Sequence, residues 1–498
     1  MLRFLGGGAL IALLTMVTIS TAVCEGVSTI ADVLGKGHLI TSAYLTPAAP
    51  GQAQTILLIG SDKRALSKSL ADRNSPPHTD TIILIRLDSD LGLVSVMSVP
   101  RDLLVPSFTF KGQTYHDQKI NYAYTVGNQY GGPTDGDNLT LRVVEKALGN
   151  ITINDIIDLN FQSFVDVVAK LGCVYVNVDH WFYNLGNDGY SAIDVKPGYQ
   201  CLRGYRALDY VRYRHFDSTF ARDARQQDFL RQAKQQLGVT GLLSHYKEIL
   251  SSLAGSISTN IHSATAVLRL VELALGSLAG PVRQIQFPND PKLVQTSNGL
   301  QDDQTASPAE LHAVVGQFLS KSTTASQLPP SQPAAASTRR TRRRSGRVAA
   351  AGLTATLDAT RTQAVNLSTS VPFAVYLPSL TYDWAVQDGG PFEYYAYRLK
   401  DLQGKRHWAY HITWQVTKAS AGSYYGIEGT DWTDVPLFDR ADIRHYGGRT
   451  YRLVGNGRHI QDIGWIAGSA LYWISNTVFD DLSNAQMIAL AQSAQPVA

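Results

Sequence analysis

The stretch DTIILIRLDSDLGLVSVMSV, residues 80–99, contains two apolar runs on either side of a short polar segment. Residues 80–87 and 91–99 are rich in Val, Ile and Leu, as strands are, and residues 88–90 are typical of a turn. We therefore expect a β-hairpin. The run TILLIG, residues 55–60, predicts a further buried strand before it.

Three charged residues lie at the predicted ends of these strands. Asp62 follows the first strand, Asp80 opens the second, and Arg101 follows the third. The hairpin places Asp80 opposite about Val99–Pro100, with Arg101 beside it. If the first strand runs antiparallel to the second, Asp62 lies at the same edge. We therefore expect two carboxylates and one guanidinium at one end of the sheet.

Two groups of polar residues follow later in the chain. Arg212 and Arg214 share a face on an extended segment but point in opposite directions on a helix, so they converge on one ligand only in the extended case. A helix predicted at 220–237 has four residues in one stripe. These are Arg222, Arg225, Gln226 and Phe229.

The chemistry of these groups favours a phosphate ligand. Forked guanidinium groups suit phosphate oxygens, and paired carboxylates suit a hard divalent cation such as Mg²⁺. Together they are typical of a site for metal-bound pyrophosphate. The alternative is ordinary surface salt bridging. No glycine-rich phosphate loop accompanies the pattern, so spacing alone leaves both interpretations open.

The rest of the first folded region, residues 50–321, alternates strands and helices. Its periodicity predicts helices at 137–148, 161–171, 220–237, 242–254 and 263–278, and further strands at 174–178 and 283–287. This order predicts an α/β or α+β sandwich with a central mixed sheet flanked by helices.

A linker and a second folded region complete the chain. Residues 322–352 are rich in Ser, Pro and Arg and cannot bury enough apolar surface to fold. Residues 353–498 predict a smaller α+β or mostly β accessory domain. Its expected strands are 408–414, 451–454 and 470–475, with a closing helix at 486–491.

The N-terminus predicts the compartment. Residues 4–23 are apolar and uncharged, which at ~1.5 Å per residue is enough to cross a bilayer core of ~30 Å. Arg3 precedes this run, and Glu25 and Asp32 follow it, so the positive-inside rule predicts a cytoplasmic N-terminus. We expect residues 1–40 to form a single-pass cell-membrane anchor and stalk, with the remaining chain extracytoplasmic. A cleaved signal peptide and a lipoprotein signal ending at Cys24 are the alternatives.

The composition excludes several classes of protein. With 498 residues, 44% of them hydrophobic, the chain can bury a large core, so wholesale disorder is excluded. A net charge of +3 is too small for a general nucleic-acid binder. Three cysteines exclude a disulfide-dense scaffold. Outside the cytoplasm Cys173 and Cys201 form either a disulfide or two buried thiols.

Seven motifs in one order carry a family resemblance. They are residues 56–62 (ILLIGSD), 79–84 (TDTIIL), 98–102 (SVPRD), 119–124 (KINYAY) with Gly131-Gly132, 164–166 (FVD) with Leu171-Gly172, 204–208 (GYRAL) running into 210–214 (YVRYR), and 225–227 (RQQ). Over about residues 50–320 the chain resembles the LytR-CpsA-Psr family of cell-wall glycopolymer ligases.

The resemblance implies a membrane-anchored phosphotransferase. Such an enzyme moves a glycopolymer from a polyprenyl-pyrophosphate carrier onto peptidoglycan as a phosphodiester, with the membrane lipid of the carrier in an apolar pocket. It implies Mg²⁺ as cofactor, with Mn²⁺ as the alternative ion, and no nucleic-acid partner. Two other functions would use the same residues: hydrolysis of polyprenyl-linked pyrophosphates, and non-catalytic binding of polyprenyl phosphates.

The resemblance also assigns roles to residues. It implies that Asp62 and Asp80 hold the metal. The residues implied in pyrophosphate binding are Arg101, Arg212, Arg214, Arg222 and Gln226.

One position departs from the family pattern. The family commonly has an arginine two positions before the second aspartate, where this chain has His78. Either His78 donates to phosphate, or Arg73 reaches in from a lengthened loop. We expect the catalytic residues to be Arg101, Asp80 and Asp102, with Asp102 either a general base or, preferably, the group that holds Arg101.

Overall fold

The structure is a computed structural model. It describes residues 38–49, 51–62, 76–186, 192–213, 217–236, 257–261, 282–288, 291–296, 299–321, 352–387, 392–417, 422–456 and 458–497, with a few single residues between 263 and 277. The predicted anchor at 4–23, the predicted helix at 242–254 and the linker up to residue 351 lie outside these residues, and so does most of the helix predicted at 263–278. None of the described helices is long and apolar enough to cross a membrane.

The chain divides into two compact units. Unit 1 consists of Met1–Cys173, Arg203–Arg212 and Arg222–Thr323. Unit 2 consists of Val174–Leu202, Tyr213–Ala221 and Thr324–Ala498. Unit 2 therefore combines the C-terminal region with segments that the sequence analysis places in the first folded region.

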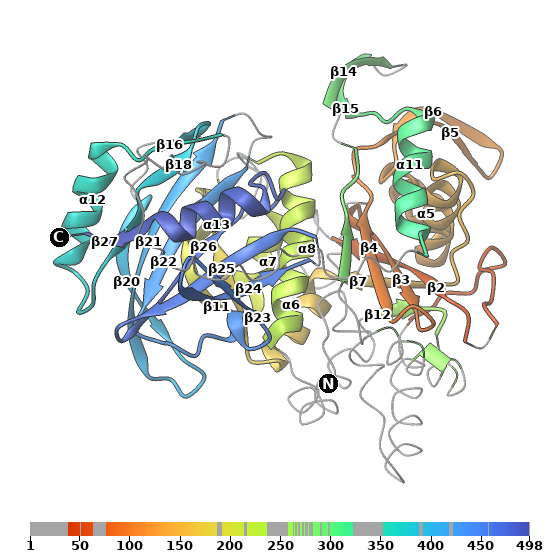
Figure 1. The fold of residues 1–498 in the computed structure, drawn as a ribbon. Coiled ribbons are helices and arrows are strands. Elements are labelled where there is room, and N and C mark those ends of the chain that lie inside the picture. The colour runs from red at the N-terminus through yellow and green to blue at the C-terminus, as the bar shows by residue number, and fades with distance from the viewer. Residues whose placement is uncertain are drawn as a thin grey trace, which may run out of the picture. The chain divides into compact units, whose positions relative to one another are not determined.

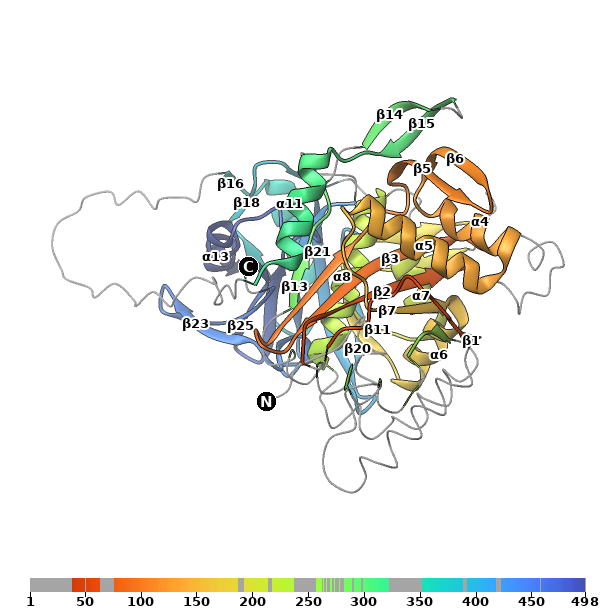
Figure 2. The same cartoon turned by 90° about the vertical axis from the view of Figure 1, so that its right-hand side faces the viewer.

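The core of unit 1 is a seven-stranded mixed sheet (Figures 1 and 2). In spatial order its strands are β1 (His38–Leu39), β12 (Ile257–Thr259), β7 (Asp155–Asn160), β2 (Gln54–Ser61), β3 (Thr79–Asp88), β4 (Leu93–Ser98) and β13 (Val282–Ile285). β2, β3 and β4 are antiparallel neighbours, whereas β7 is parallel to β2 and β13 is parallel to β4. The predicted mixed sheet, its hairpin and its antiparallel first strand are confirmed.

The hairpin register differs slightly from the predicted one. Ile83 pairs with Ser98, and the N–H of Val99 donates to the carbonyl of Ile82 at 2.8 Å. Continued to the end of the strands, this register puts Asp80 opposite Arg101 rather than Val99–Pro100. The reason is the turn, which Gly92 with a φ of 58° prolongs beyond the expected residue 90.

Helices cover both faces of this sheet. Leu57, Leu84 and Met97 belong to one buried core with side chains of α4 (Tyr122–Gly131), α5 (Pro133–Ala147) and α11 (Pro308–Leu319). Ser98 points to the other face, where its hydroxyl accepts a hydrogen bond from Gln227 at 2.8 Å. Gln227 lies on α8 (Thr219–Gln236), which Figure 2 shows behind the sheet.

The other elements of unit 1 are short. They are the hairpins β5 (Leu104–Phe110) with β6 (Gln113–Lys119) and β14 (Pro291–Thr296) with β15 (Gly299–Gln304), and the helices α6 (Phe161–Lys170) and α7 (Gly204–Arg212). The helices predicted at 137–148, 161–171 and 220–237 are confirmed as α5, α6 and α8.

Unit 2 is built on an eight-stranded antiparallel sheet. Its strands are β19 (Ala385–Val386), β20 (Tyr394–Lys400), β21 (Arg406–Val416), β22 (Tyr424–Thr430), β26 (Ala470–Ser475), β25 (Ile460–Ala467), β24 (Arg449–Gly455) and β23 (Asp442–Tyr446). The sheet core, which includes Ile427 and Trp465, packs against α12 (Asp358–Ser368) and α13 (Asn484–Ser493). The expected strands at 408–414, 451–454 and 470–475 and the closing helix are confirmed.

Short paired strands complete unit 2. They are β8 (Val174–Val178) with β11 (Gly198–Leu202), β9 (Phe182–Asn184) with β10 (Ile193–Val195), β16 (Leu353–Ala355) with β18 (Leu380–Tyr382), and β17 (Tyr376–Pro378) with β27 (Ala494–Pro496). A 3-10 helix, η1, covers Pro436–Phe438.

Both cysteines of the middle region are oxidised. Cys173 and Cys201 are disulfide-bonded, so the bonded alternative holds and the alternative of two free thiols is wrong. Disulfides persist in oxidising compartments.

The apolar face of β3 should dominate the stability of unit 1. Leu84 is fully buried in the centre of the sheet, so Leu84→Ala should lower the free energy of unfolding by about 2–5 kcal/mol. Leu319 at the end of α11 is 37% exposed, and Leu319→Ala should change it by less than about 0.5 kcal/mol. Urea unfolding of both variants checks this, and equal losses would contradict the assignment of the core.

Candidate functional site

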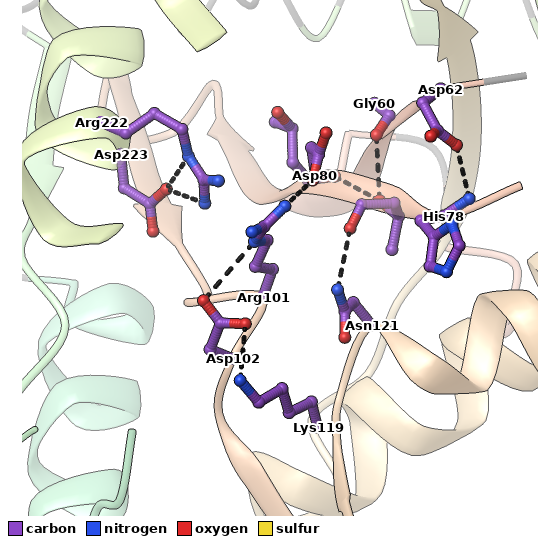
Figure 3. A network of polar contacts seen from close by, with 12 residues as sticks. Gly60, Asp62, His78, Asp80, Arg101, Asp102, Lys119, Asn121, Arg222 and Asp223 are labelled. Atoms are coloured by element: carbon purple, nitrogen blue, oxygen red, sulfur yellow. Dashed lines mark hydrogen bonds and ion pairs between the residues drawn. The ribbon is translucent and has the colours of Figure 1, made fainter. Parts of the chain in front are cut away.

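Asp62 is held at the end of β2 by the backbone of residue 78. The N–H of Asp62 donates to the carbonyl of His78 at 3.0 Å, and Asp62 Oδ1 accepts the N–H of His78 at 2.5 Å (Figure 3). The side chain of His78 is exposed. Because the peptide group of residue 78 makes both of these contacts, they do not require an arginine side chain at that position.

Asp80 lies in an irregular step of β3. Gly60 pairs with Thr81 and Ser61 pairs with Thr79, so one extra residue, Asp80, stands on β3 at this point. Such a bulge redirects a side chain and is frequent beside functional sites. Gly60 is required here because a Cβ at this position would lie 2.8 Å from Cβ of Thr81.

Arg101 links two carboxylates. Its Nη1 forms an ion pair with Asp80 Oδ1, and its Nε lies 3.5 Å from Asp102 Oδ2 (Figure 3). Burial lowers the pKa of Arg101, but the charges of Asp80 and Asp102 outweigh burial and leave the pKa raised. The guanidinium therefore stays charged, and 23% of the side chain remains exposed to a ligand.

Asp102 has a further cationic neighbour. Lys119 Nζ lies 3.3 Å from Asp102 Oδ1 and 3.3 Å from Asp303 Oδ1. The side chain of Asp102 is 7% exposed. A buried carboxylate that faces two cations is a poor proton acceptor, so this geometry favours the interpretation in which Asp102 holds Arg101.

The first turns of α8 bring a second guanidinium to this region. Arg222 is 2% exposed, and its Nη2 and Nε lie 3.0 and 3.3 Å from Asp223 Oδ1. Burial raises the pKa of Asp223 to about 6, against the lowering effect of Arg222. Asp102 raises this pKa further and Arg101 lowers it, which puts the Arg222–Asp223 pair within electrostatic range of Arg101. Figure 3 shows this pair beside Arg101.

The remaining polar residues of the α8 stripe hold α7. Arg225 Nη1 donates to the carbonyl of Tyr210 at 3.3 Å, and Gln226 Nε2 donates to the carbonyl of Val211 at 3.1 Å. Both side chains are buried. The stripe is confirmed as one helical face, but in this structure Gln226 satisfies a carbonyl at the end of α7.

Arg212 lies on a helix rather than on an extended segment. Arg212 is the last residue of α7, and its Nη2 pairs with Asp209 Oδ1 at 3.1 Å. The helical alternative therefore holds at Arg212, because the apolar spacing of Ala207, Leu208 and Val211 buries one face of a helix. Arg214 and Arg73 lie outside the described residues.

Asp62 and Asp80 have the chemistry that a hard cation needs. Carboxylate oxygens suit Mg²⁺, which commonly takes one or two of them and completes its shell with waters and substrate phosphates. Within the described ranges there is no group of three or more His, Cys, Asp or Glu that could hold a metal ion. The two aspartates thus fit a magnesium ion that is shared with a phosphate ligand.

Sequence reasoning missed three residues of this site. Lys119 pairs with both Asp102 and Asp303, and Asp223 pairs with Arg222. The position of Asp223 directly after Arg222 could have indicated this pair. Asp223 lies outside the helical stripe of Arg222, Arg225, Gln226 and Phe229, so the stripe did not include it. No sequence pattern could have indicated Asp303. The isolated bridge between Leu103 and Gln304, which brings Asp303 close to Lys119, is a long-range contact.

Asp223 should make the stability of unit 1 depend on pH. With a pKa raised from 3.8 to about 6, the folded state keeps a proton that the unfolded state releases. The free energy of unfolding should therefore fall, by up to ~3 kcal/mol, as the pH rises from about 4 to about 6, and stay level above that. Urea midpoints across this range should show the fall in the wild type and in the control Asp90→Asn, but not in Asp223→Asn. Parallel pH profiles in all three chains would refute the assignment.

Comparison with known proteins identifies the family. A teichoic acid transferase, TagU of Bacillus cereus, is 29% identical over 209 residues, which are 42% of this chain and 60% of TagU. TagT of Bacillus subtilis is 26% identical over 215 residues, 43% of this chain and 62% of TagT. The chain therefore spans about three fifths of the length of these relatives.

Solved structures show similar matches. The crystal structure of B. subtilis TagV is 22% identical with a TM-score of 0.42, over 54% of this chain and 97% of TagV. A structure of TagT bound to LIIa-WTA is 22% identical with a TM-score of 0.41, over 55% of this chain and 92% of that one. The model of the LytR_cpsA_psr family matches residues 28–311, more than half of the chain. The chain belongs to the LytR_cpsA_psr family.

Proposed function

We propose that this protein is a phosphotransferase that moves a glycopolymer from a polyprenyl-pyrophosphate carrier onto peptidoglycan as a phosphodiester. Membership of the family supports this proposal. So do the names of the relatives in Bacillus cereus and Bacillus subtilis, which are polyisoprenyl-teichoic acid–peptidoglycan teichoic acid transferases. The glycopolymer and acceptor of this chain need not be those of the relatives.

One observation carries the proposal. Arg101 is fixed between Asp80 and Asp102 and remains partly exposed, with Arg222 in the same region. A guanidinium held in advance can neutralise charge on a phosphate without reorganising during the reaction. The ion pairs that fix Arg101 thus suit phosphoryl transfer, which asks mainly for positioning and charge neutralisation.

The chemistry balances as a single displacement. A hydroxyl of a peptidoglycan sugar attacks the sugar-proximal phosphorus of the carrier, a new P–O bond forms, and the bond to the bridging oxygen breaks. Polyprenyl phosphate leaves and the hydroxyl proton passes to solvent or to a base. Arg101 would bind the pyrophosphate oxygens during this step, and Asp102 would keep Arg101 in place.

Asp62 and Asp80 would hold Mg²⁺, which when bound supplies further positive charge for the pyrophosphate. The bulge at Asp80 and the backbone bonds at Asp62 set the positions of both carboxylates before any ligand arrives. His78, which is exposed beside Asp62, would be free to turn toward a phosphate oxygen.

The reaction would take place outside the cytoplasm at the membrane surface. The disulfide-bonded Cys173 and Cys201 support an oxidising compartment. The apolar N-terminal run supports an anchor that keeps the site close to a lipid-linked donor.

The activity test uses the full chain in detergent with a lipid-linked oligosaccharide and a peptidoglycan oligomer. We expect Mg²⁺-dependent transfer of the labelled oligosaccharide to the acceptor. Release of a free phosphosugar would instead identify a pyrophosphatase, and binding without turnover would identify a carrier-binding protein.

Arg101→Ala should reduce the transfer rate by about 10²–10³-fold, because one positioned donor to developing charge is lost. The matched control is Arg142→Ala, since Arg142 is an exposed arginine of α5 in the same unit. Thermal unfolding should be similar in both variants. Activity of Arg101→Ala within about twofold of the wild type would remove Arg101 from the site.

Asp62→Asn should weaken metal binding by roughly tenfold, since it removes one of two charged ligands while its side-chain oxygen still accepts the His78 N–H. Titration with Mn²⁺, followed by electron paramagnetic resonance, measures this without turnover. Asp90→Asn is the control, because Asp90 is exposed in the turn at the other end of the hairpin. Equal Mn²⁺ affinity in both variants would exclude Asp62 as a ligand.

A further inference from the structure

The hairpin of β20 and β21 in unit 2 ends in a cluster of positive charge, which we call the cationic tip. Its members are Arg398, Lys400, Lys405 and Arg406, and all four are exposed. Arg398 pairs with Trp408 and Lys400 pairs with Arg406 across the two strands. Facing residues of a pair point to the same side, so three cations and one tryptophan occupy one face. The alternate residues Leu399 and His407 are buried on the other face.

The acid in the hairpin turn does not neutralise this face. The carboxylate of Asp401 accepts the N–H groups of Gln403 and Lys405 through Oδ1, at 2.9 and 2.8 Å. Its Oδ2 lies 3.0 Å from Nε2 of His407. Only 9% of the Asp401 side chain is exposed, so its charge is committed to the turn.

His407 fixes the shape of the tip from below. Its Nδ1 lies 2.9 Å from Asp431 Oδ1, and its ring stacks on Trp432 at 5.7 Å. In addition, the carbonyl of Lys400 accepts the hydroxyl of Tyr175 at 2.6 Å. These contacts thus hold in place the backbone that carries the cations.

The positive charges of the cationic tip repel one another when no ligand is bound. Lys400 and Arg406 face each other across the strands, and like charges in that position destabilise a sheet. Over the described part of the chain, no ion pair joins any cation of the tip to a carboxylate. An anionic ligand would relieve this repulsion.

We propose that the cationic tip binds successive phosphate groups of a linear anionic glycopolymer. The choice of this ligand class rests on the proposed function. Arg398 and Lys400, two residues apart on β20, repeat at about 7 Å along the strand, which suits a charged chain lying along the hairpin. β20 pairs only with β21 among the described strands, so a polymer can approach it from the edge of the sheet (Figure 1).

A membrane surface fits this face less well than a polymer. The guanidinium of Arg398 lies 3.3 Å from the ring centre of Trp408 and covers it, so this ring is not offered for insertion between lipids. The exposed apolar residue of the turn is Leu402 alone. Binding to lipid surfaces scales with buried apolar area as well as charge.

The test compares two variants of the full chain in detergent. Lys400→Gln with Arg406→Gln removes two charges from the tip and leaves the Arg398–Trp408 contact and His407 in place. Arg361→Gln with Arg458→Gln removes two charges from other exposed positions of the same unit. The probe is fluorescent poly(glycerol phosphate), which carries no lipid and no pyrophosphate. Matching thermal unfolding verifies that both variants fold.

The tip variant should bind the probe roughly tenfold more weakly than the wild type at low salt, and its affinity should depend less on salt. The control variant should stay within about twofold. Equal affinities, or equal losses in both variants, would overturn the inference. So would an unchanged affinity for the polymer together with a lost affinity for phosphatidylglycerol vesicles, which would identify a membrane contact.

The same preparations separate this inference from the proposed function. If the wild type transfers no oligosaccharide but the tip variant loses probe affinity, the proposed reaction fails and the polymer-binding tip stands. If transfer proceeds normally and the tip variant binds like the wild type, the inference alone fails.

Discussion

The ion pair between Arg101 and Asp80 is the interaction on which the site depends. It joins the exit of β4 to the start of β3, and Asp102 holds the same guanidinium from the other side. Each neighbour has its own support: Lys119, which also pairs with Asp303, holds Asp102, and the bulge opposite Gly60 and Ser61 directs Asp80. A network of this kind fixes the positions of its charged side chains before a ligand binds.

Burial makes the ion pair of Arg222 and Asp223 costly for the folded state. Arg222 and Asp223 lie almost out of contact with water, and burial raises the pKa of Asp223 to about 6 despite its partner. Proteins commonly retain an arrangement that costs the folded state free energy where that arrangement serves a functional site. Here it maintains a second guanidinium within electrostatic range of Arg101, in a setting where water screens charges weakly.

Much of this could be predicted from the sequence. The strands of unit 1 follow from short apolar runs, and the meeting of Asp62, Asp80 and Arg101 at one edge follows from antiparallel pairing. Local patterns could not give the exact hairpin register, which Gly92 shifts, nor the helical state of Arg212. Long-range contacts were also hidden: nothing near Asp303 indicates Lys119, and nothing in Val174–Leu202 indicates that this segment packs with the C-terminal region.

The two hydrogen bonds between Asp62 and His78 have a consequence for substitutions at position 78. One bond joins the N–H of Asp62 to the carbonyl of His78, and the other joins the N–H of His78 to Oδ1 of Asp62. Residue 78 contributes its peptide group to both bonds, and every amino acid except proline can supply the N–H that the carboxylate accepts. A change of side chain at position 78 can thus leave both bonds in place while it alters the surface beside Asp62 that a ligand would meet.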